Sequence, residues 1–220
     1  MALHMNPSPT DLIPEAELAA WRGMPTAVMS DELNRSCAMS AAIKPVAPGM
    51  VFAGQALTIQ AMAADNAASH YALTLVWPGS VVVIDARGHV DTAMWGGILT
   101  MGAKERGAVA VVCDGAVRDV AELRESGIAI FSRGVVPNGP QKAFGGSVNA
   151  PIQCGGLAVN PGDLVVGDDD GVVVVPPDQM AGLFERCEAR IKNEENIVAQ
   201  LKAGRTTVEI SNLPPPEELG

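Results

Sequence analysis

The sequence predicts an α/β protein in which strands and helices alternate along much of the chain. Three observations lead to this fold class. The middle of the chain alternates apolar, β-branched runs with helical segments, and the links between them are short. A segment rich in Gly and Pro follows, without helical periodicity, and a long charged helix comes after it. Strands separated by helices pair in parallel through crossovers. We therefore expect a layered or barrel-like sheet with flanking helices.

Length and composition favour one domain over residues 1–220. Of the 220 residues, 48% are hydrophobic and only 18% are charged. A chain of this length can bury one sizeable core, which we place at about residues 25–176. The low charged fraction indicates more apolar surface than a small monomer needs, so we expect subunit contacts. The N-terminal helices and a C-terminal helix over 177–204 are the expected contact elements.

The charge of the chain excludes several classes of function. Its net charge is −10, and nucleic-acid binding depends on cationic side chains that meet phosphates. No basic run is present, so we expect no nucleic-acid partner. No signal peptide is visible, and no apolar run reaches the roughly 18 residues that a membrane span needs. The four cysteines form no CxxC pair. We expect a cytoplasmic protein with buried, reduced thiols and no membrane association.

The N-terminal third is expected to form two helices, one strand and a third helix. Residues 10–35 carry two helical segments, the first opened by Asp11 or Pro14 and the second capped by Thr26. The run over 50–62 mixes β-branched residues with Gly54 and predicts a strand. The run over 65–76 is typical of a helix.

The middle third has the clearest alternation. It predicts strands at 80–86, 108–114 and 128–134, with helices at 98–107 and 118–127 between them, a Gly-rich bend before the first helix and a turn at 115–117 before the second. The first helix ends with basic residues and a glycine, as helix C-termini prefer. This order predicts a parallel sheet with right-handed crossovers.

The segment over 138–180 predicts β-hairpins. Asp170-Gly171 is the strongest hairpin signal, because a two-residue Asp-Gly turn suits the twist of antiparallel strands. Asp168, Asp169 and Asp170 lack the spacing of a calcium loop, so we interpret them as turn residues. In the last helix, Glu188, Glu194 and Glu195 form an acidic face that is solvated by default, and one of them reaching a neighbouring subunit is the alternative.

Arg118-Asp119 is the first candidate site, because the pair directly follows a buried strand. Ligand sites of α/β folds gather beyond the carboxyl ends of strands. An arginine binds a carboxylate through a planar fork, and an aspartate binds hard cations through oxygen. Two interpretations stay open. The pair holds a metal and an anionic substrate, or Asp119 caps a helix while Arg118 pairs with Glu122.

Two further features have weaker signals. Gly96 and Gly97 precede a helix, so their N–H groups are placed either to cradle an anion or to form a tight turn. His70 and His89 are isolated in the sequence. His89 follows a strand in a Gly-rich bend, so it is the histidine that we consider for substrate contact.

Taken together, "WGGILTMGAKERGAVAVVCDGAVRDVAEL" and "GDDDGVVVVP" resemble the RraA-like proteins. That family includes class II pyruvate aldolases acting on 4-hydroxy-4-methyl-2-oxoglutarate and 4-carboxy-4-hydroxy-2-oxoadipate, and the regulator of ribonuclease activity A. The resemblance covers residues 65–176. It implies a swivelling β/β/α fold, a homotrimer often paired into a homohexamer, and a divalent metal, Mg²⁺ or Mn²⁺.

The resemblance also implies roles for individual residues. In the aldolases the arginine of the Arg-Asp pair contacts the pyruvyl group and the aspartate ligates the metal, which correspond to Arg118 and Asp119. Loop amides hold the pyruvate carboxylate, and the matching loop residues here are Gly96, Gly97, Ile98 and Leu99. A glutamate from the C-terminal helix of a neighbouring subunit acts through metal-bound water, and Glu194 is the best match.

One position departs from the aldolase pattern. Aldolases carry an aspartate separated from the Arg-Asp pair by twenty intervening residues, and this sequence has Gly97 at that position. The resemblance implies a metal-dependent lyase that releases pyruvate from a 4-hydroxy-2-oxo dicarboxylic acid, with oxaloacetate decarboxylase activity as a side reaction. A non-catalytic regulator that binds a ribonuclease is the alternative. Which group replaces the missing carboxylate stays open.

Overall fold

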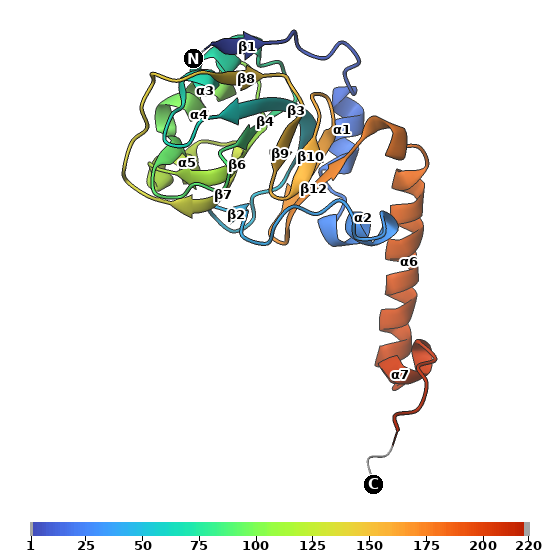
Figure 1. The fold of residues 1–220 in the computed structure, drawn as a ribbon. Helices are drawn as coiled ribbons and strands as arrows, with labels where there is room; N and C mark the ends of the chain where they lie inside the picture. The colour runs from blue at the N-terminus through green and yellow to red at the C-terminus, as the bar shows by residue number, and fades with distance from the viewer. Residues whose placement is uncertain (1, 218–220) are drawn as a thin grey trace.

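The computed structural model describes residues 2–217 and contains a ten-stranded mixed sheet with helices on both sides (Figure 1). Its parallel part consists of four neighbouring strands: β3 (Phe52–Ala61), β4 (Ser80–Asp85), β6 (Ala110–Val117) and β7 (Ala129–Val135). The predicted parallel sheet is confirmed. Because these strands run the same way, their carboxyl ends meet at one edge, and the loops of that edge build the candidate site.

Side chains of each central strand alternate between two cores. In β4, Val82 and Ile84 face the helices, whereas Val81 and Val83 face a second β layer. This alternation is the period of two that a strand imposes, and apolar residues on both faces explain the uninterrupted hydrophobic run. Three elements cover the helical face: α3 (Ala67–Ala72), α4 (Gly97–Lys104) and α5 (Val120–Glu125).

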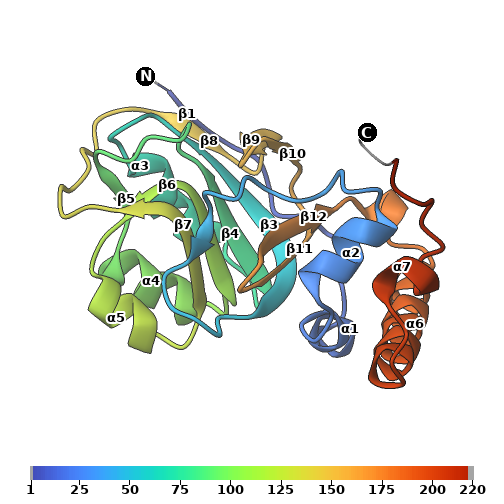
Figure 2. The same ribbon diagram turned by 90° about the horizontal axis from the view of Figure 1, so that it is seen from below.

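The second β layer grows from β3. The hairpin of β11 (Leu164–Asp168) and β12 (Gly171–Val175) pairs antiparallel with the first half of β3. A small antiparallel sheet, β9 (Ile152–Cys154) with β10 (Leu157–Val159), adds to the same core. The predicted hairpins are therefore confirmed, and β3 is the strand at which the two β layers join (Figure 2).

A third layer of helices packs outside the β11–β12 hairpin. It contains α1 (Glu15–Trp21), α2 (Thr26–Glu32) and the start of α6 (Leu183–Lys202), where Leu183 and Cys187 are fully buried. The rest of α6 extends away from the body of the molecule and carries α7 (Thr207–Ile210) near its end (Figure 1). Most of the long helix is consequently available for contacts outside its own chain.

Short elements complete the chain. They are β1 (Leu3–Met5), β2 (Lys44–Pro45), η1 (Leu73–Leu75), β5 (Ala93–Trp95), β8 (Gly146–Val148) and η2 (Pro177–Gln179). None of the helices between residues 2 and 217 combines the length and apolar character needed to cross a lipid bilayer. All four cysteines are buried free thiols, as expected.

Two local predictions were wrong. The turn expected at 115–117 is part of β6, because Gly115 packs tightly there: an added Cβ would lie 2.7 Å from Ala86 Cβ. Close backbone approach, not a turn, explains this glycine. Thr26 does not cap α2. The cap position is Pro25, and the Thr26 N–H and hydroxyl both donate to the Asp168 carboxylate, at 2.9 and 2.7 Å.

Candidate functional site

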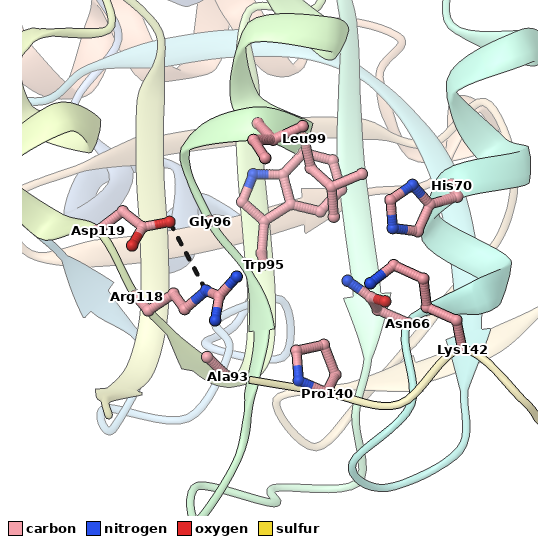
Figure 3. A pocket seen from close by; sticks show the side chains of 11 residues that line it. Asn66, His70, Ala93, Trp95, Gly96, Leu99, Arg118, Asp119, Pro140 and Lys142 are labelled. Carbon is pink, nitrogen blue, oxygen red and sulfur yellow. Dashed lines mark ion pairs between the residues drawn. The ribbon is translucent and has the colours of Figure 1, made fainter. Parts of the chain in front are cut away.

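A pocket of about 130 Å³ opens where β5 and β6 end. Arg118 and Asp119 line one side of it, and Asn66, His70 and Lys142 line the opposite side (Figure 3). The two sides come from segments far apart in the sequence, joined only by the order of strands in the sheet. The pocket has the size for a small molecule of a few heavy atoms.

Strand β5 positions the Arg118-Asp119 pair. It runs parallel to the end of β6, with Trp95 opposite Val117, and the Arg118 N–H donates to the Trp95 carbonyl at 3.0 Å. The pairing places the Gly96-Gly97 bend directly beside Arg118 and Asp119. Strand β5 thus brings together two features predicted from the sequence, the Arg118-Asp119 pair and the Gly96-Gly97 bend.

Asp119 adopts a left-handed backbone conformation, with φ 63° and ψ 37°. Its side chain makes no capping hydrogen bond with α5. Instead, its Oδ2 accepts from the Gly97 N–H at 3.0 Å and lies 3.7 Å from Arg118 Nε. The interpretation of Asp119 as a helix cap is therefore wrong, and the strained conformation aims its carboxylate at the pocket edge.

Gly96 is required by close packing. A Cβ on Gly96 would lie 2.6 Å from Asp119 Oδ2 and 3.1 Å from Arg118 Cγ, so a larger residue would displace the pair. A buried hydrogen-bond chain holds the bend from behind: Trp95 Nε1 donates to Thr100 Oγ1 at 2.7 Å, and that hydroxyl donates to the Gly96 carbonyl at 3.0 Å. The chain fixes the entrance to α4.

The first turn of α4 presents unused donors. The Gly97 N–H is used by Asp119. Within residues 2–217, no acceptor is found for the backbone N–H groups of Ile98 and Leu99, both of which line the pocket. Free N–H groups at the start of a helix attract anions, because they carry the positive end of the helix dipole. The Gly96 N–H also has no acceptor among the described residues, so three of the four predicted cradle residues have amides to offer.

Asp65 holds the opposite side of the pocket in place. It is buried, and its Oδ2 accepts from the N–H groups of Ala143 and Phe144, at 2.7 and 3.1 Å. Its Oδ1 accepts from the Ala67 N–H at 2.9 Å, at the start of α3. One carboxylate therefore ties α3 to the loop between β7 and β8, and that loop brings Lys142 to the pocket.

Two polar side chains of this wall are notable. Asn66 is 5% exposed, and its Oδ1 has no hydrogen-bond partner among the described residues. A buried acceptor without a partner is costly unless a ligand or water satisfies it. Burial lowers the pKa of His70, and the charge of Lys142 lowers it further. His70 is consequently neutral at pH 7 and able to accept a hydrogen bond.

The residues present fit a hard divalent cation held by few protein ligands. No group of three or more His, Cys, Asp or Glu side chains between residues 2 and 217 is arranged as a closed metal cage. Mg²⁺ commonly uses one or two carboxylates and keeps several waters. Asp119 suits that role, because its side chain is 38% exposed and no partner of its Oδ1 is found in the described chain.

Other predicted residues lie elsewhere. Glu194 is on the projecting part of α6, where it pairs with Arg190 Nε at 3.3 Å, and it does not line the pocket of its own chain. His89 does not line the pocket either; its Nε2 is buried without a partner among the described residues. Asp168–Asp170 form the β11–β12 turn, as expected, with the Asp170 N–H donating to Asp168 Oδ1.

Sequence reasoning missed most of the far wall. Asn66 and His70 stood in a predicted helix without any chemical motif, and Lys142 stood in a segment interpreted only as hairpins. One general signal was available, because ligand sites of α/β folds lie beyond the carboxyl ends of the parallel strands. The helix α3 follows β3, so its first turn lies at the same edge of the sheet as Arg118. The rule would have added Asn66 to the candidates, but it applies equally to His89, which follows β4.

Comparisons with known proteins agree with this architecture. A family model described as RraA-like, Aldolase/RraA, matches residues 26–174. A Halalkalibacterium halodurans protein named "Putative 4-hydroxy-4-methyl-2-oxoglutarate aldolase" is 35% identical over 178 residues, which cover 81% of this chain and 85% of the relative.

Two solved structures are also similar. An uncharacterized protein from Pseudomonas syringae pv. tomato is 30% identical with a TM-score of 0.78, covering 91% of this chain and 95% of that one. The RNA-processing inhibitor RraA from Thermus thermophilis is 33% identical with a TM-score of 0.64, covering 69% and 92%. The family match spans most of the chain, including both strands and the bend that form the pocket, so this protein belongs to the RraA-like family.

Proposed function

We propose that this protein is a divalent-metal-dependent lyase that cleaves a 4-hydroxy-2-oxo dicarboxylic acid and releases pyruvate. One observation carries the proposal: the Arg118 guanidinium and the Asp119 carboxylate lie side by side at a pocket that also receives the free N–H groups of α4. The name of the Halalkalibacterium halodurans relative supports the same reaction class.

Each part of the pocket suits one part of such a substrate. The N–H groups of Ile98 and Leu99 suit the carboxylate next to the 2-oxo group. The Arg118 guanidinium suits the oxo oxygen, on which negative charge develops when the bond between C3 and C4 breaks. Lys142, across the pocket, suits the second carboxylate (Figure 3). A dicarboxylate thus meets cationic or N–H groups on both sides.

The reaction balances without an external oxidant or reductant. The 4-hydroxyl loses its proton, the C3–C4 bond breaks, and its electron pair forms pyruvate enolate while C4 becomes a carbonyl. The enolate then takes a proton at C3. A divalent cation, Mg²⁺ or Mn²⁺, would be held by Asp119 and would supply a Lewis acid that stabilises the enolate charge. Arg118 adds a fixed positive charge beside it, and oxaloacetate decarboxylation passes through the same enolate.

Exposed apolar side chains at and beside the pocket support a homo-oligomer, a trimer or hexamer. Ile98 is 85% exposed and Met101 is 55% exposed, although both are apolar and stand beside the site. The projecting α6 has the length to reach another subunit, and in that arrangement Glu194 would approach a neighbour's Asp119. Light scattering after size exclusion measures the mass directly, and a monomer would contradict the assembly.

A coupled assay tests the function. Pyruvate is measured with lactate dehydrogenase after addition of 4-hydroxy-4-methyl-2-oxoglutarate, 4-carboxy-4-hydroxy-2-oxoadipate or oxaloacetate, with Mg²⁺ or Mn²⁺. We expect pyruvate release that EDTA abolishes and added metal restores. No pyruvate from any of these substrates, at any metal concentration, would refute the lyase.

A non-catalytic regulator of a ribonuclease is the second candidate. It is favoured by the likeness to the Thermus thermophilis RNA-processing inhibitor and by the absence of a side chain at Gly97. The net charge of −10 would suit a basic segment of such a partner. Retention of a purified ribonuclease on the immobilised protein, together with no metal-dependent pyruvate release, would favour this candidate over the lyase.

A further inference from the structure

The space that a side chain at residue 97 would need is already filled. Gly97 is the first residue of α4, and an added Cβ there would lie 2.1 Å from Glu122 Oε2 and 3.3 Å from Glu122 Cδ. A distance of 2.1 Å is too short for a real Cβ contact, so the exposed Glu122 side chain would have to move aside. The carboxylate of Glu122 therefore occupies the position that the first atoms of a residue-97 side chain would take.

The position of a Cβ added to Gly97 also lies beside Asp119. The Asp119 Cβ is 3.7 Å from it, so Asp119 and Glu122 flank one position at the start of α4. They are three residues apart around the first turn of α5, which puts their side chains on one face. Two carboxylates are thus gathered at the start of α4, where Asp119 lines the pocket and Glu122 lines the neighbouring hollow.

Two cationic side chains lie near the two carboxylates, but neither forms an ion pair with Glu122 in the described chain. Arg118 Nε is 3.7 Å from Asp119, and no hydrogen bond or ion pair to the Glu122 carboxylate is found within the described chain. Lys104 lines the same hollow as Glu122, but its Nζ donates to the Ser126 carbonyl at 2.6 Å. Like charges at short range destabilise each other unless a cation joins them.

An independent feature of the pocket also indicates a ligand. Asn66 Oδ1, on the opposite wall, is buried and has no partner among the described residues. Its free lone pairs require a donor or a hydrated ion that the chain itself does not provide. A hydrated divalent cation in the pocket would give Asn66 Oδ1 a donor and would give the two carboxylates a shared positive charge.

We propose, building on the function above, that Glu122 is a positioning residue that supplies the second carboxylate of the site from the place of a residue-97 side chain. It acts through the cation at Asp119, adding negative charge and a hydrogen-bond acceptor around it. Supporting groups of this kind commonly change metal affinity by about 10- to 100-fold. Glu122 then accounts for how a site with Gly97 keeps a pair of carboxylates.

Metal affinity without turnover is the first test. Calorimetric titration of the full chain with MnCl₂ compares wild type, Glu122→Gln and Glu125→Gln. Glu125 is the matched control, because it lies on the same helix and lines the same hollow but does not approach Gly97. We expect the Mn²⁺ Kd to rise about tenfold in Glu122→Gln and to stay near the wild-type value in Glu125→Gln.

Three results of this titration would overturn the proposal. The first is unchanged affinity in Glu122→Gln. The second is equal weakening in both variants, which would mean a general effect of surface charge. The third is a wild-type protein that binds no Mn²⁺.

A rescue experiment is the sharper test, because a purely structural role cannot produce it. Gly97→Asp, Glu122→Ala and the double variant are compared by thermal unfolding, Mn²⁺ titration and kcat. We expect Gly97→Asp alone to lower Tm slightly, because it adds a third carboxylate beside Asp119 and Glu122. Glu122→Ala alone should fold but bind Mn²⁺ weakly. The double variant should regain Tm and return to within about threefold of wild-type Kd and kcat.

Failure of this inference is distinguishable from failure of the proposed lyase. A folded double variant that binds Mn²⁺ as weakly as Glu122→Ala would overturn the inference, even if wild type releases pyruvate. Conversely, Mn²⁺ affinities that follow the expected pattern would support Glu122 as the second carboxylate, even if no tested 2-oxo acid yields pyruvate.

Discussion

Two Arg–Asp pairs stand near the carboxyl end of β6, and they differ in how fully they are satisfied. Arg133 and Asp114 meet at 2.5 Å, with side chains 25% and 10% exposed, and Asp114 Oδ2 also accepts from the Gly155 N–H at 2.9 Å. Arg118 and Asp119 are 3.7 Å apart and about 40% exposed. The first pair lies at the cleft between β4, β6 and β7, and the second lies at the candidate site.

The number of carboxylate oxygens that already have a partner indicates which pair is available to a ligand. Asp114 has both oxygens engaged, so it has little to offer a ligand, and its ion pair ties β7 to β6. Asp119 has one oxygen on a backbone N–H and no found partner for the other within the described residues. Identical residue types are therefore fully hydrogen-bonded in one place and open to a ligand in the other, which is why we propose a binding role only for Arg118 and Asp119.

The largest expected effect is a loss of activity when the more exposed pair, Arg118 and Asp119, is broken. Arg118→Ala should lower kcat/KM for pyruvate release by about 10³-fold, because the fixed charge beside the developing enolate is lost. Tm should change by no more than about 2 °C, since an exposed pair contributes little to stability. The coupled pyruvate assay and calorimetry measure the two values. Retention of a tenth of the wild-type rate would contradict the role of Arg118.

Breaking the buried pair, Arg133 and Asp114, should lower stability and leave activity nearly unchanged. Asp114→Ala leaves Arg133 without its partner and the Gly155 N–H without an acceptor. We expect unfolding free energy to fall by about 3 kcal/mol, which corresponds to roughly 6–12 °C in Tm for a chain of this size. The kcat/KM of the folded protein should stay within about threefold of wild type. A large loss of rate at unchanged Tm would place Asp114 in the chemistry.

Removing the Thr100 hydroxyl, which holds the bend beside Arg118 and Asp119, should have smaller effects on both stability and KM. Thr100→Val keeps the volume but removes the acceptor for Trp95 Nε1 and one donor to the Gly96 carbonyl. Trp95 Nε1 loses its partner, whereas the Gly96 carbonyl keeps the Thr100 N–H, at 3.1 Å, so we expect about 2 kcal/mol of destabilisation. KM should rise several-fold because the Gly96 bend loosens. Urea denaturation and steady-state kinetics test this, and Thr100→Ser, which keeps the hydroxyl, should behave like wild type.

The smallest expected effect concerns Asp85, which lies in the same cleft as Arg133 and Asp114 and is 7% exposed. Burial raises the pKa of its carboxyl, Asp114 adds to the increase, and the N–H and charge of Arg87 oppose it. The folded chain thus keeps this proton to a higher pH than the unfolded chain, whose value is about 3.8. The stabilising contribution is present below that pH and is lost as pH rises through the raised pKa.

Asp85→Asn has no charge to bury, so it tests that dependence. The stability of the variant relative to wild type should improve as pH is raised from about 3.5 to 7, across the raised pKa. Urea midpoints of both proteins across this range measure the change. A difference that stays flat with pH would mean that the Asp85 carboxyl titrates alike in the folded and unfolded chains.

Local pattern predicted much of the fold. Val81–Ile84 form an uninterrupted apolar run, and a strand buried on both faces needs no other signal. Asp170-Gly171 predicted a hairpin here, but the turn lies one residue earlier, at Asp169-Asp170, and Gly171 is the first residue of β12, opposite Asp168. Predictions failed where a residue type is required by a neighbour that is distant in the sequence. Gly115 was interpreted as part of a turn, but a glycine is needed there because Ala86 packs against it.

The sequence by itself determined the α/β class, the parallel central strands and the candidate pair Arg118-Asp119, because strand period, turn chemistry and a charged pair after a buried strand are properties of adjacent residues. Only the tertiary structure decided which residues share the pocket and what stands at Gly97. Asn66 and Lys142 reach Arg118 through strand order and a loop held by Asp65, and Glu122 fills the space at Gly97 because α4 and α5 converge. These contacts join segments that no local pattern relates, so their placement depends on the packing of the whole chain.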